Sequence, residues 1–474
     1  MLKSLTTTDR ALLIIGFALV IFFSSYRLFA SPETWMDEGL IIQTAKGILE
    51  TGKASLPVAP GVYEPLGYIS TGFPVTLPLA GVFGVFGVSI EAARLIMLAF
   101  LLSFYVVLWF YTRRTIGGVA AWLGFFLLVF FGPLYGNGRN VLGEIPGLLF
   151  ILLALLPLLE SGVLTRNKAL LVGIGAGLAV ATKPIFILFL PALLLALLLR
   201  HQELELKKVF FFGVVGVLVP LFVWALFQFD HVSILRVLEV YVNPHDLNIQ
   251  NALAANVKRF FTELQPLYFL FALGIWTVSY ALRKLRRESI PLAEEALLFF
   301  SILVFLAYLR TAGYYRYFFP AQVFALLYLP QSLWYLVGKR SQLFSRVVIV
   351  GLCGLILFQA YETAFRSWTA THYNSTRTEA LQKYFASVPA EEEIFVYQAP
   401  EVVPFLDGRP VYQYVEITPS IRAGSQQARL VQSGGVQWVF TPEDFFIAHR
   451  DTLFERYTIM EKIDSYVAAE LKAR

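Results

Sequence analysis

The chain has 474 residues, of which 57% are hydrophobic, 16% aromatic and only 15% charged, and its formal net charge is +5. Soluble domains carry about 25% charged residues, so this composition excludes a soluble globule and indicates a protein that crosses a membrane many times. Most of the basic excess lies in short flanks between apolar runs. It therefore argues for membrane orientation and against nucleic-acid binding.

Apolar runs of about 16–22 residues recur along the first three quarters of the chain, and each approaches the length that crosses about 30 Å of hydrocarbon as a helix. The run at 73–88 is an exception, because Pro74, Pro78 and three glycines interrupt it. We expect that run to be interfacial or re-entrant. The sequence then predicts about 11 transmembrane helices, near residues 11–30, 92–111, 116–133, 145–160, 169–182, 184–199, 209–229, 263–282, 292–309, 317–337 and 347–364.

The basic residues support this count. With 11 spans, all the larger basic clusters fall on one side, which the positive-inside rule assigns to the cytoplasm. These clusters are Lys3 and Arg10, Arg113 and Arg114, Arg166 and Lys168, Arg200 with Lys207 and Lys208, Arg283 to Arg287, and Lys339 with Arg340 and Arg346. Counting 73–88 as a span would move the Arg283 to Arg287 cluster outside. We therefore expect a multi-pass protein of the plasma membrane with a cytoplasmic amino terminus.

The segment 31–91, after the first span, is the first outward loop in this topology. It is acidic, and we expect it to be ordered, with interfacial helices. Its acidic residues are Glu33, Asp37, Glu38, Glu50, Glu64 and Glu91.

Hydropathy falls from about residue 367, and the pattern changes to short alternating runs. Segments 393–398, 411–416 and 436–441 are typical of strands, and 376–387 and 461–472 are predicted to be helical. The chain is thus divided into a transmembrane domain, residues 1–366, and a small soluble α/β domain, residues 367–474, on the extracytoplasmic side.

Asp37 and Glu38 stand in Trp35-Met36-Asp37-Glu38-Gly39, where the chain leaves the membrane. An acidic pair at an interface is commonly a solvated helix end. Here the second outward turn adds Glu144, and Asp37, Glu38 and Glu144 are candidate oxygen ligands for a hard divalent cation such as Mg²⁺ or Mn²⁺. The structural alternatives are that Glu144 favours a helix amino terminus and that Asp37 pairs with Arg139.

Lys183, between two apolar helices, and Arg316, among tyrosines, are candidate phosphate-binding cations on the same face. Arg139, Tyr315 and Tyr317 are further candidates for the same phosphate. The alternative for Arg316 is snorkelling within an aromatic belt. His245 is a candidate substrate contact in the outward loop after residue 230.

Other common enzyme and transporter signatures are absent from the sequence. It contains no Walker loop, no dinucleotide-binding glycine fingerprint, no Gly-x-Ser-x-Gly elbow and no His-Glu-x-x-His helix. Its halves do not resemble transporter repeats by hydropathy.

Five motifs together resemble the GT-C integral-membrane glycosyltransferases, in the branch of the protein O-mannosyltransferases and the lipid A aminoarabinose transferase. In chain order these are Trp35 to Gly39, Phe86 to Leu95, Arg139 to Pro146, Ala181 to Pro184 and Tyr315 to Pro320. The resemblance covers roughly residues 10–365, together with the soluble domain that follows the last span.

The resemblance implies roles for several residues. It makes Asp37, with Glu38 beside it, the catalytic base or a metal ligand, and Glu144 a second acid at the site. Lys183 and Arg316 match contacts to the donor phosphate. Where the family commonly has a basic residue followed by two prolines, this chain has Glu64-Pro65-Leu66. This departure makes Glu64 a further candidate metal ligand and implies a different donor or metal arrangement.

The chain is therefore expected to transfer a hexosyl or pentosyl unit from a polyprenyl-phosphate donor to a hydroxyl or amine on a glycan, glycolipid or protein, with inversion, in cell-envelope glycosylation. Two alternatives remain open: a polyprenyl-phosphate glycolipid flippase, and a catalytically silent scaffold of the same fold.

Overall fold

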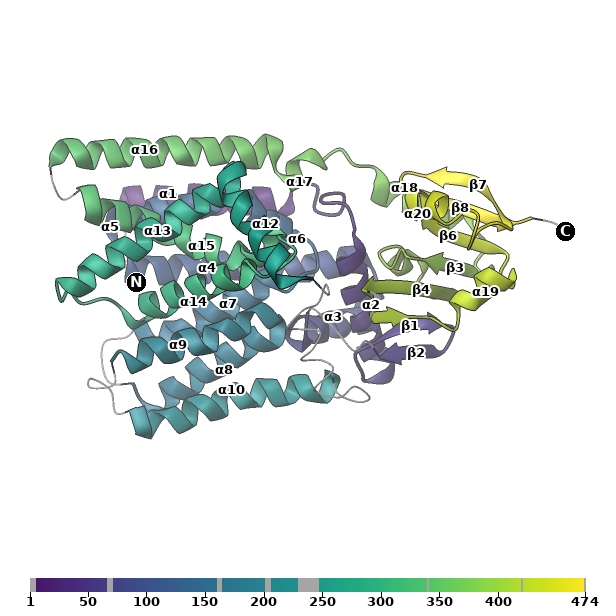
Figure 1. Ribbon diagram of the computed structural model, residues 1–474, viewed down its shortest axis with the longest axis horizontal. Helices are drawn as coiled ribbons and strands as arrows, with labels where there is room; N and C mark the ends of the chain where they lie inside the picture. The colour runs from purple at the N-terminus through teal and green to yellow at the C-terminus, as the bar shows by residue number, and fades with distance from the viewer. Residues whose placement is uncertain are drawn as a thin grey trace.

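The computed structural model describes residues 6–65, 71–159, 164–200, 206–228, 247–338, 341–418 and 421–472. His245 lies outside the described residues. The molecule is elongated, with a helical bundle at one end and a sheet at the other, and the two ends of the chain lie toward opposite ends of the long axis (Figure 1).

The bundle consists of helices from residue 7 to residue 366, and each of the 11 predicted segments overlaps one of them. They are α1 (Thr7–Ser25), α4 (Ile90–Thr115), α5 (Gly118–Val129), α6 (Gly132–Arg139), α7 (Glu144–Leu155), η2 (Leu156–Leu159), α8 (Arg166–Thr182), η3 (Pro184–Leu188), α9 (Phe189–Leu198), α10 (Leu206–Gln228), α12 (Ile249–Thr262), α13 (Leu264–Leu285), α14 (Leu292–Tyr308), η4 (Tyr315–Tyr317), α15 (Phe319–Leu333), η5 (Trp334–Gly338), α16 (Gln342–Tyr361) and η6 (Glu362–Arg366).

Within the described residues, five helices are long and apolar enough to cross a membrane, and the bent pair α5 and α6 makes up to six. The chain is thus a multi-pass membrane protein. Three shorter apolar helices lie at 73–86, 144–159 and 184–198. The number of 11 spans and their orientation stay predictions.

Local sequence explains where these helices begin and how closely they pack. Ser89 caps α4, since its hydroxyl accepts a hydrogen bond of 3.1 Å from the Ala92 amide. Between α8 and α10, glycines allow backbone to touch backbone: a Cβ at Gly173 would lie 2.2 Å from the Gly213 carbonyl oxygen. Small residues of this kind are what close helix packing in membranes requires.

The described residues of the first loop form regular secondary structure. It contains α2 (Met36–Thr51), an antiparallel hairpin of β1 (Ser55–Ala59) and β2 (Val62–Pro65), and α3 (Phe73–Phe86). With 14 residues, α3 rises only about 21 Å, which is short of a membrane crossing.

The sheet region, residues 377–472, is a six-stranded mixed sheet in the order β5-β4-β3-β6-β8-β7. Its strands are β3 (Ile394–Tyr397), β4 (Val411–Thr418), β5 (Ile421–Ala423), β6 (Trp438–Pro442), β7 (Tyr457–Ile463) and β8 (Tyr466–Leu471), and its helices are α18 (Arg377–Ser387), η7 (Val403–Leu406), α19 (Ala428–Ser433) and α20 (Glu443–Ala448). One apolar cluster forms under α18 and another under α19 and α20. The predicted boundary after residue 366 falls between η6 and the short α17 (Trp368–Thr371).

The predicted helix at 461–472 is wrong. These residues form the end of β7, a turn at Asp464, and β8. The aromatic and β-branched residues Ile463, Tyr466 and Val467 pair into the sheet, and this tertiary pairing overrides the helical preference of the alanines that follow.

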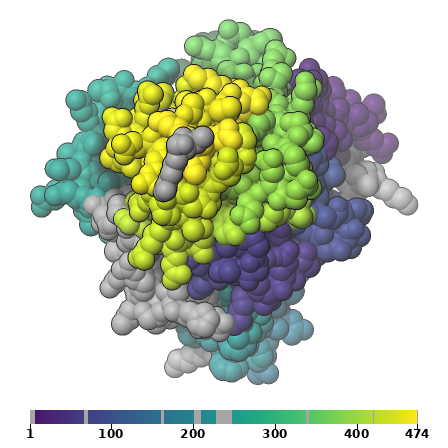
Figure 2. All heavy atoms as spheres, turned by 90° about the vertical axis from the view of Figure 1, so that its right-hand side faces the viewer, coloured from purple at the N-terminus to yellow at the C-terminus, as the bar shows by residue number. Residues whose placement is uncertain are grey.

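The first loop and the sheet region lie directly against one another, as the purple and yellow-green surfaces of Figure 2 show. Gln43 donates 2.7 Å to the Pro400 carbonyl, and Lys46 lies 2.6 Å from Asp407. Gly39 is required here, because a Cβ at that position would lie 2.4 Å from the Glu401 backbone. The beginning of α2 is therefore held between the bundle and the sheet region.

Candidate active site

Asp37 lies in the first turn of α2, where a carboxylate is favoured by the helix dipole. Its Oδ2 accepts a hydrogen bond of 2.5 Å from Nη1 of Arg316, which belongs to η4, between α14 and α15. Each side chain is about a quarter exposed, at 24%. The pair is thus reachable from solvent, and 279 residues of chain separate its members.

Three aromatic rings surround the Arg316 guanidinium. Its carbon lies 5.1 Å from the ring centroid of Trp35, 5.8 Å from that of Tyr314 and 5.4 Å from that of Tyr317. Cation–π contacts of this kind hold a guanidinium in place without neutralising it. Arg316 is therefore held against Asp37 by these three rings.

Glu144 and Lys183 form a second pair. Glu144 opens α7, Lys183 follows α8, and the lysine Nζ donates to Glu144 Oε1, with both side chains buried. The other carboxylate oxygen, Oε2, is buried and makes no hydrogen bond within the described residues. An unsatisfied buried carboxylate oxygen is costly, and this one can still accept a hydrogen bond.

Close backbone packing joins the segments that carry these side chains. The Gly72 amide donates 3.0 Å to the Thr182 carbonyl, and a Cβ on Gly143 would lie 3.2 Å from Thr71 Oγ1 and 3.3 Å from Lys183 Cβ. Burial acts to lower the pKa of Arg316, but the charges of Asp37 and Glu144 outweigh it and raise that pKa above its ordinary value. The structure thus pairs Asp37 with Arg316 and Glu144 with Lys183, and the charge of Glu144 acts on Arg316.

Glu38 does not share this site, which corrects its assignment as a catalytic partner of Asp37. Its carboxylate is 1% exposed and accepts hydrogen bonds of 3.0 and 2.8 Å from Arg94, which is itself fully buried. Arg94 also donates to the Leu28 carbonyl and to Asn140 Oδ1. Successive residues of a helix point in different directions, so Asp37 and Glu38 diverge and Glu38 holds α2 to α4.

Arg139 and Tyr315 also lie elsewhere than predicted. Arg139 is buried, donates 2.6 Å to the Tyr26 carbonyl and lies over the Tyr373 ring, so it ties α6 to the end of α1. Asp37 pairs with Arg316 and not with Arg139. The Tyr315 hydroxyl donates to Glu263 and its ring lies under Arg259. Tyr317, beside Arg316, is the one of these three that remains at the site.

The predicted metal ligands do not fit a single metal site. Glu64 lies in β2 and accepts a hydrogen bond of 2.9 Å from the Gly424 amide of the sheet region. Asp37 and Glu144 each bond a cationic side chain. Among the residues that the structure describes, no group of three or more His, Cys, Asp or Glu side chains could hold a metal ion.

Sequence reasoning missed the role of Trp35 and the partnership of Arg94 with Glu38. A signal for Arg94 was present, because an arginine at the start of an apolar helix needs a buried partner, and Glu38 is a nearby carboxylate in the same outward loop. Nothing in the sequence indicates that Trp35 faces Arg316.

With this geometry established, comparison with known proteins shows what the chain resembles. Residues 75–227 match the family model described as dolichyl-phosphate-mannose-protein mannosyltransferase. None of the curated proteins matches the chain by sequence.

Solved structures match over nearly the whole chain. ArnT from Cupriavidus metallidurans in the apo state has a TM-score of 0.63 at 14% identity, covering 98% of each chain. The same protein bound to undecaprenyl phosphate has a TM-score of 0.60 at 13% identity, covering 96% of this chain and 97% of that one. The oligosaccharyltransferase AglB from Archaeoglobus fulgidus, in complex with an inhibitory peptide and a dolichol-phosphate, has a TM-score of 0.57 at 14% identity, covering 93% of this chain and 69% of that one.

The fold is therefore that of the GT-C integral-membrane glycosyltransferases, and the predicted resemblance to this superfamily is confirmed.

Proposed function

We propose that the chain is an inverting glycosyltransferase. It moves one sugar from a polyprenyl-phosphate donor to a hydroxyl or amine of a glycan, glycolipid or protein on the extracytoplasmic face of the plasma membrane. The observation that carries this proposal is the presence of two carboxylate–cation pairs, Asp37 with Arg316 and Glu144 with Lys183, within a GT-C fold. Support comes from the matching family model and from neighbours bound to undecaprenyl phosphate and dolichol-phosphate.

Asp37 and Glu144 bind the cations Arg316 and Lys183 in the way that a donor phosphate would. Arginine and lysine bind phosphate through the same charge-assisted N–H donors that they offer to a carboxylate. A donor phosphate that enters competes for Arg316 and Lys183. Once it binds, Asp37 is released from its ion pair, so the base becomes available only when the donor is in place.

The reaction then balances with the residues present. The acceptor oxygen or nitrogen attacks the anomeric carbon, its bond to that carbon forms, and the bond from the carbon to the phosphate oxygen breaks. The acceptor proton passes to Asp37, and polyprenyl phosphate leaves with its charge stabilised by Lys183 and Arg316. A phosphate leaving group needs no general acid. No step is assigned to a divalent cation, because the candidate ligands do not form one site.

We assign the approach of the acceptor to the side of the molecule that the sheet region covers. It covers the outer end of α2 through Gln43 and Lys46, so it bounds the route by which an acceptor reaches Asp37. The donor, with its lipid, approaches instead from the bundle.

The test is to incubate the purified protein in lipid nanodiscs with a panel of labelled polyprenyl-phosphate sugars and candidate acceptors. The proposal expects transfer with at least one donor and its loss in Asp37→Asn. Movement of intact glycolipid across vesicles without turnover would instead establish a flippase, and donor binding without turnover or transport would establish a silent scaffold.

A further inference from the structure

Two polypeptide segments cross beside the candidate site. One is the strap, residues 31–35, which leads from α1 into α2 and ends two residues before Asp37. The other is the junction, residues 367–377, which leads from the last helix of the bundle into the sheet region. Ser31 joins them first, because its hydroxyl donates 2.6 Å to the Thr369 carbonyl.

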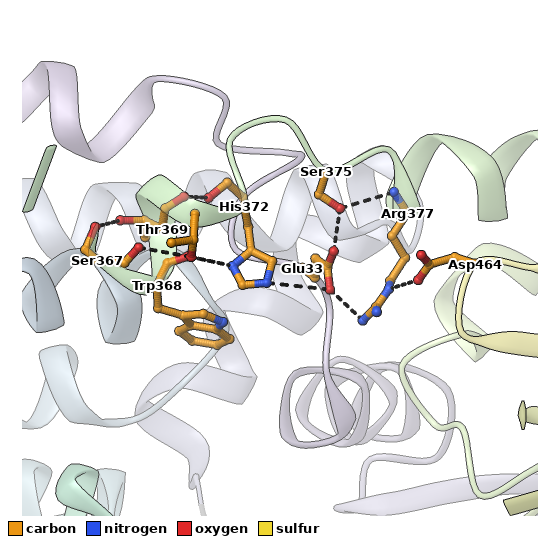
Figure 3. A network of polar contacts seen from close by, with 10 residues as sticks. Glu33, Ser367, Trp368, Thr369, His372, Ser375, Arg377 and Asp464 are labelled. Atoms are coloured by element: carbon orange, nitrogen blue, oxygen red, sulfur yellow. Dashed lines mark hydrogen bonds and ion pairs between the residues drawn. The ribbon is translucent and has the colours of Figure 1, made fainter. Parts of the chain in front are cut away.

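Glu33 lies at the centre of a network that connects the strap to the sheet region (Figure 3). Its Oε1 accepts 2.6 Å from the Ser375 hydroxyl, and its Oε2 lies 2.7 Å from Nη1 of Arg377. Arg377 in turn donates through Nε to Asp464, in the turn between β7 and β8. His372 Nε2 lies 3.9 Å from the same Glu33 carboxylate.

Aromatic contacts continue this connection to the reacting groups. Trp368 of the junction packs edge-on against Trp35 of the strap, with ring centroids 5.6 Å apart. The Arg316 guanidinium lies 5.1 Å from the Trp35 ring and bonds Asp37. The Trp35 ring is thus held on one side by the junction and on the other supports the phosphate-binding cation.

We propose that Glu33 and Trp368 are positioning residues, through which the docked sheet region sets the place of Trp35 and hence of Arg316. They touch no reacting atom. The strap is fixed only while the junction is in place, so a change in how the sheet region docks, such as acceptor binding there, alters the phosphate site. This inference rests on the proposed function for its phosphate readout.

The chain offers a matched control. Lys46 and Asp407 also form an ion pair between α2 and the sheet region, at 2.6 Å. Asp407, the residue replaced in the control, is 37% exposed, and Glu33 is 19% exposed. However, Lys46 follows Asp37 by nine residues, or about 13 Å along α2, and has no contact with the strap in the described structure. Asp407→Asn therefore removes another contact between the first loop and the sheet region without disturbing Trp35.

The experiment compares Glu33→Gln, Trp368→Leu and Asp407→Asn in nanodiscs by two measurements. One is the affinity for undecaprenyl phosphate without a sugar. The other is hydrogen–deuterium exchange of the peptide spanning residues 31–38. Trp368 is 40% exposed, so its replacement leaves the core intact.

We expect Glu33→Gln and Trp368→Leu to weaken undecaprenyl phosphate binding about tenfold, in the range of a desolvated cation–π contact, and to raise exchange in 31–38. Asp407→Asn should change neither. Equal effects in all three variants, or none in the first two, would overturn the proposal. If the parent protein binds no undecaprenyl phosphate, the donor assignment fails, and the exchange data alone decide whether the strap depends on the junction.

Discussion

Replacing Asp37 by Asn tests the assigned base with the least change in shape. The amide can still accept a hydrogen bond from Arg316, but it cannot take the acceptor proton. Loss of a general base typically lowers a rate by about 10²–10⁴, which corresponds to roughly 3–5 kcal/mol of activation free energy. We expect kcat for sugar transfer to fall by that factor.

Binding and stability should respond differently from the rate. The Asp37–Arg316 pair is 24% exposed on each side, so its loss costs at most about 1 kcal/mol of folding stability. Because Arg316 is then no longer neutralised, its affinity for polyprenyl phosphate should stay the same or tighten, by up to about fivefold. Few other defects combine slower chemistry with undiminished donor binding.

The assay measures transfer of a radiolabelled sugar in parallel with titration of undecaprenyl phosphate, and Asp407→Asn is the matched carboxylate control. If Asp37→Asn transfers sugar at the parental rate, Asp37 is not the base. If Asp37→Asn loses donor affinity instead, the Asp37 carboxylate is part of the donor site, and the proposed displacement of Asp37 from Arg316 by the donor phosphate is wrong.

Other predictions address the remaining features. Lys183→Met should weaken polyprenyl phosphate binding by about tenfold or more through loss of a charge-assisted contact. Adding Glu144→Gln to this variant should restore thermal stability but not affinity. Recovered affinity in the double variant would refute a phosphate-binding role for Lys183. Glu38→Gln should lower the free energy of unfolding by about 3–5 kcal/mol because it leaves Arg94 buried without its partner, whereas Glu38→Met with Arg94→Met should recover most of this in a denaturation series. EDTA should leave sugar transfer unchanged, and a loss that Mg²⁺ or Mn²⁺ reverses would show that the carboxylates rearrange to bind a cation. Burial acts to raise the pKa of Asp464, but the hydrogen bond and charge of Arg377 outweigh it and lower that pKa. The stability that Asp464 contributes is thus present above the unfolded pKa, about 4, and is lost as the pH falls below it. Asp464→Asn should therefore remove this acid-dependent loss from thermal melts.

Much of the bundle could be predicted from the sequence because membrane helices follow from length and apolarity alone. Each predicted run overlaps a helix, but the described helices at 144–159 and 184–198 belong with the one at 73–86 among the shorter apolar helices, and only five or six are long and apolar enough to cross a membrane. Strand pairing was harder, since β8 acquires its structure from β6 and β7 and not from its own alanines. Because strands depend on their partners in this way, the sequence also did not predict β5 or the hairpin of the first loop.

At the site, residue type indicated chemistry but not partners. Asp37, Glu144, Lys183 and Arg316 were each identifiable as expensive charges near the membrane surface. Which carboxylate meets which cation depends on helix rotation and on contacts across hundreds of residues. For that reason Glu38 and Arg139, which are charged like the site residues, proved to be buried side chains that hold helices together.

The close approach of Gly39 to the Glu401 backbone has a consequence for how the protein is made. Gln43, on the same helix, bonds Pro400 across 357 residues of sequence, so the ribosome produces the helix bearing Asp37 long before its cover. During that interval the helix lacks its contacts with the sheet region. The surroundings of Asp37 are therefore completed only after residues 400 and 401 have been synthesised.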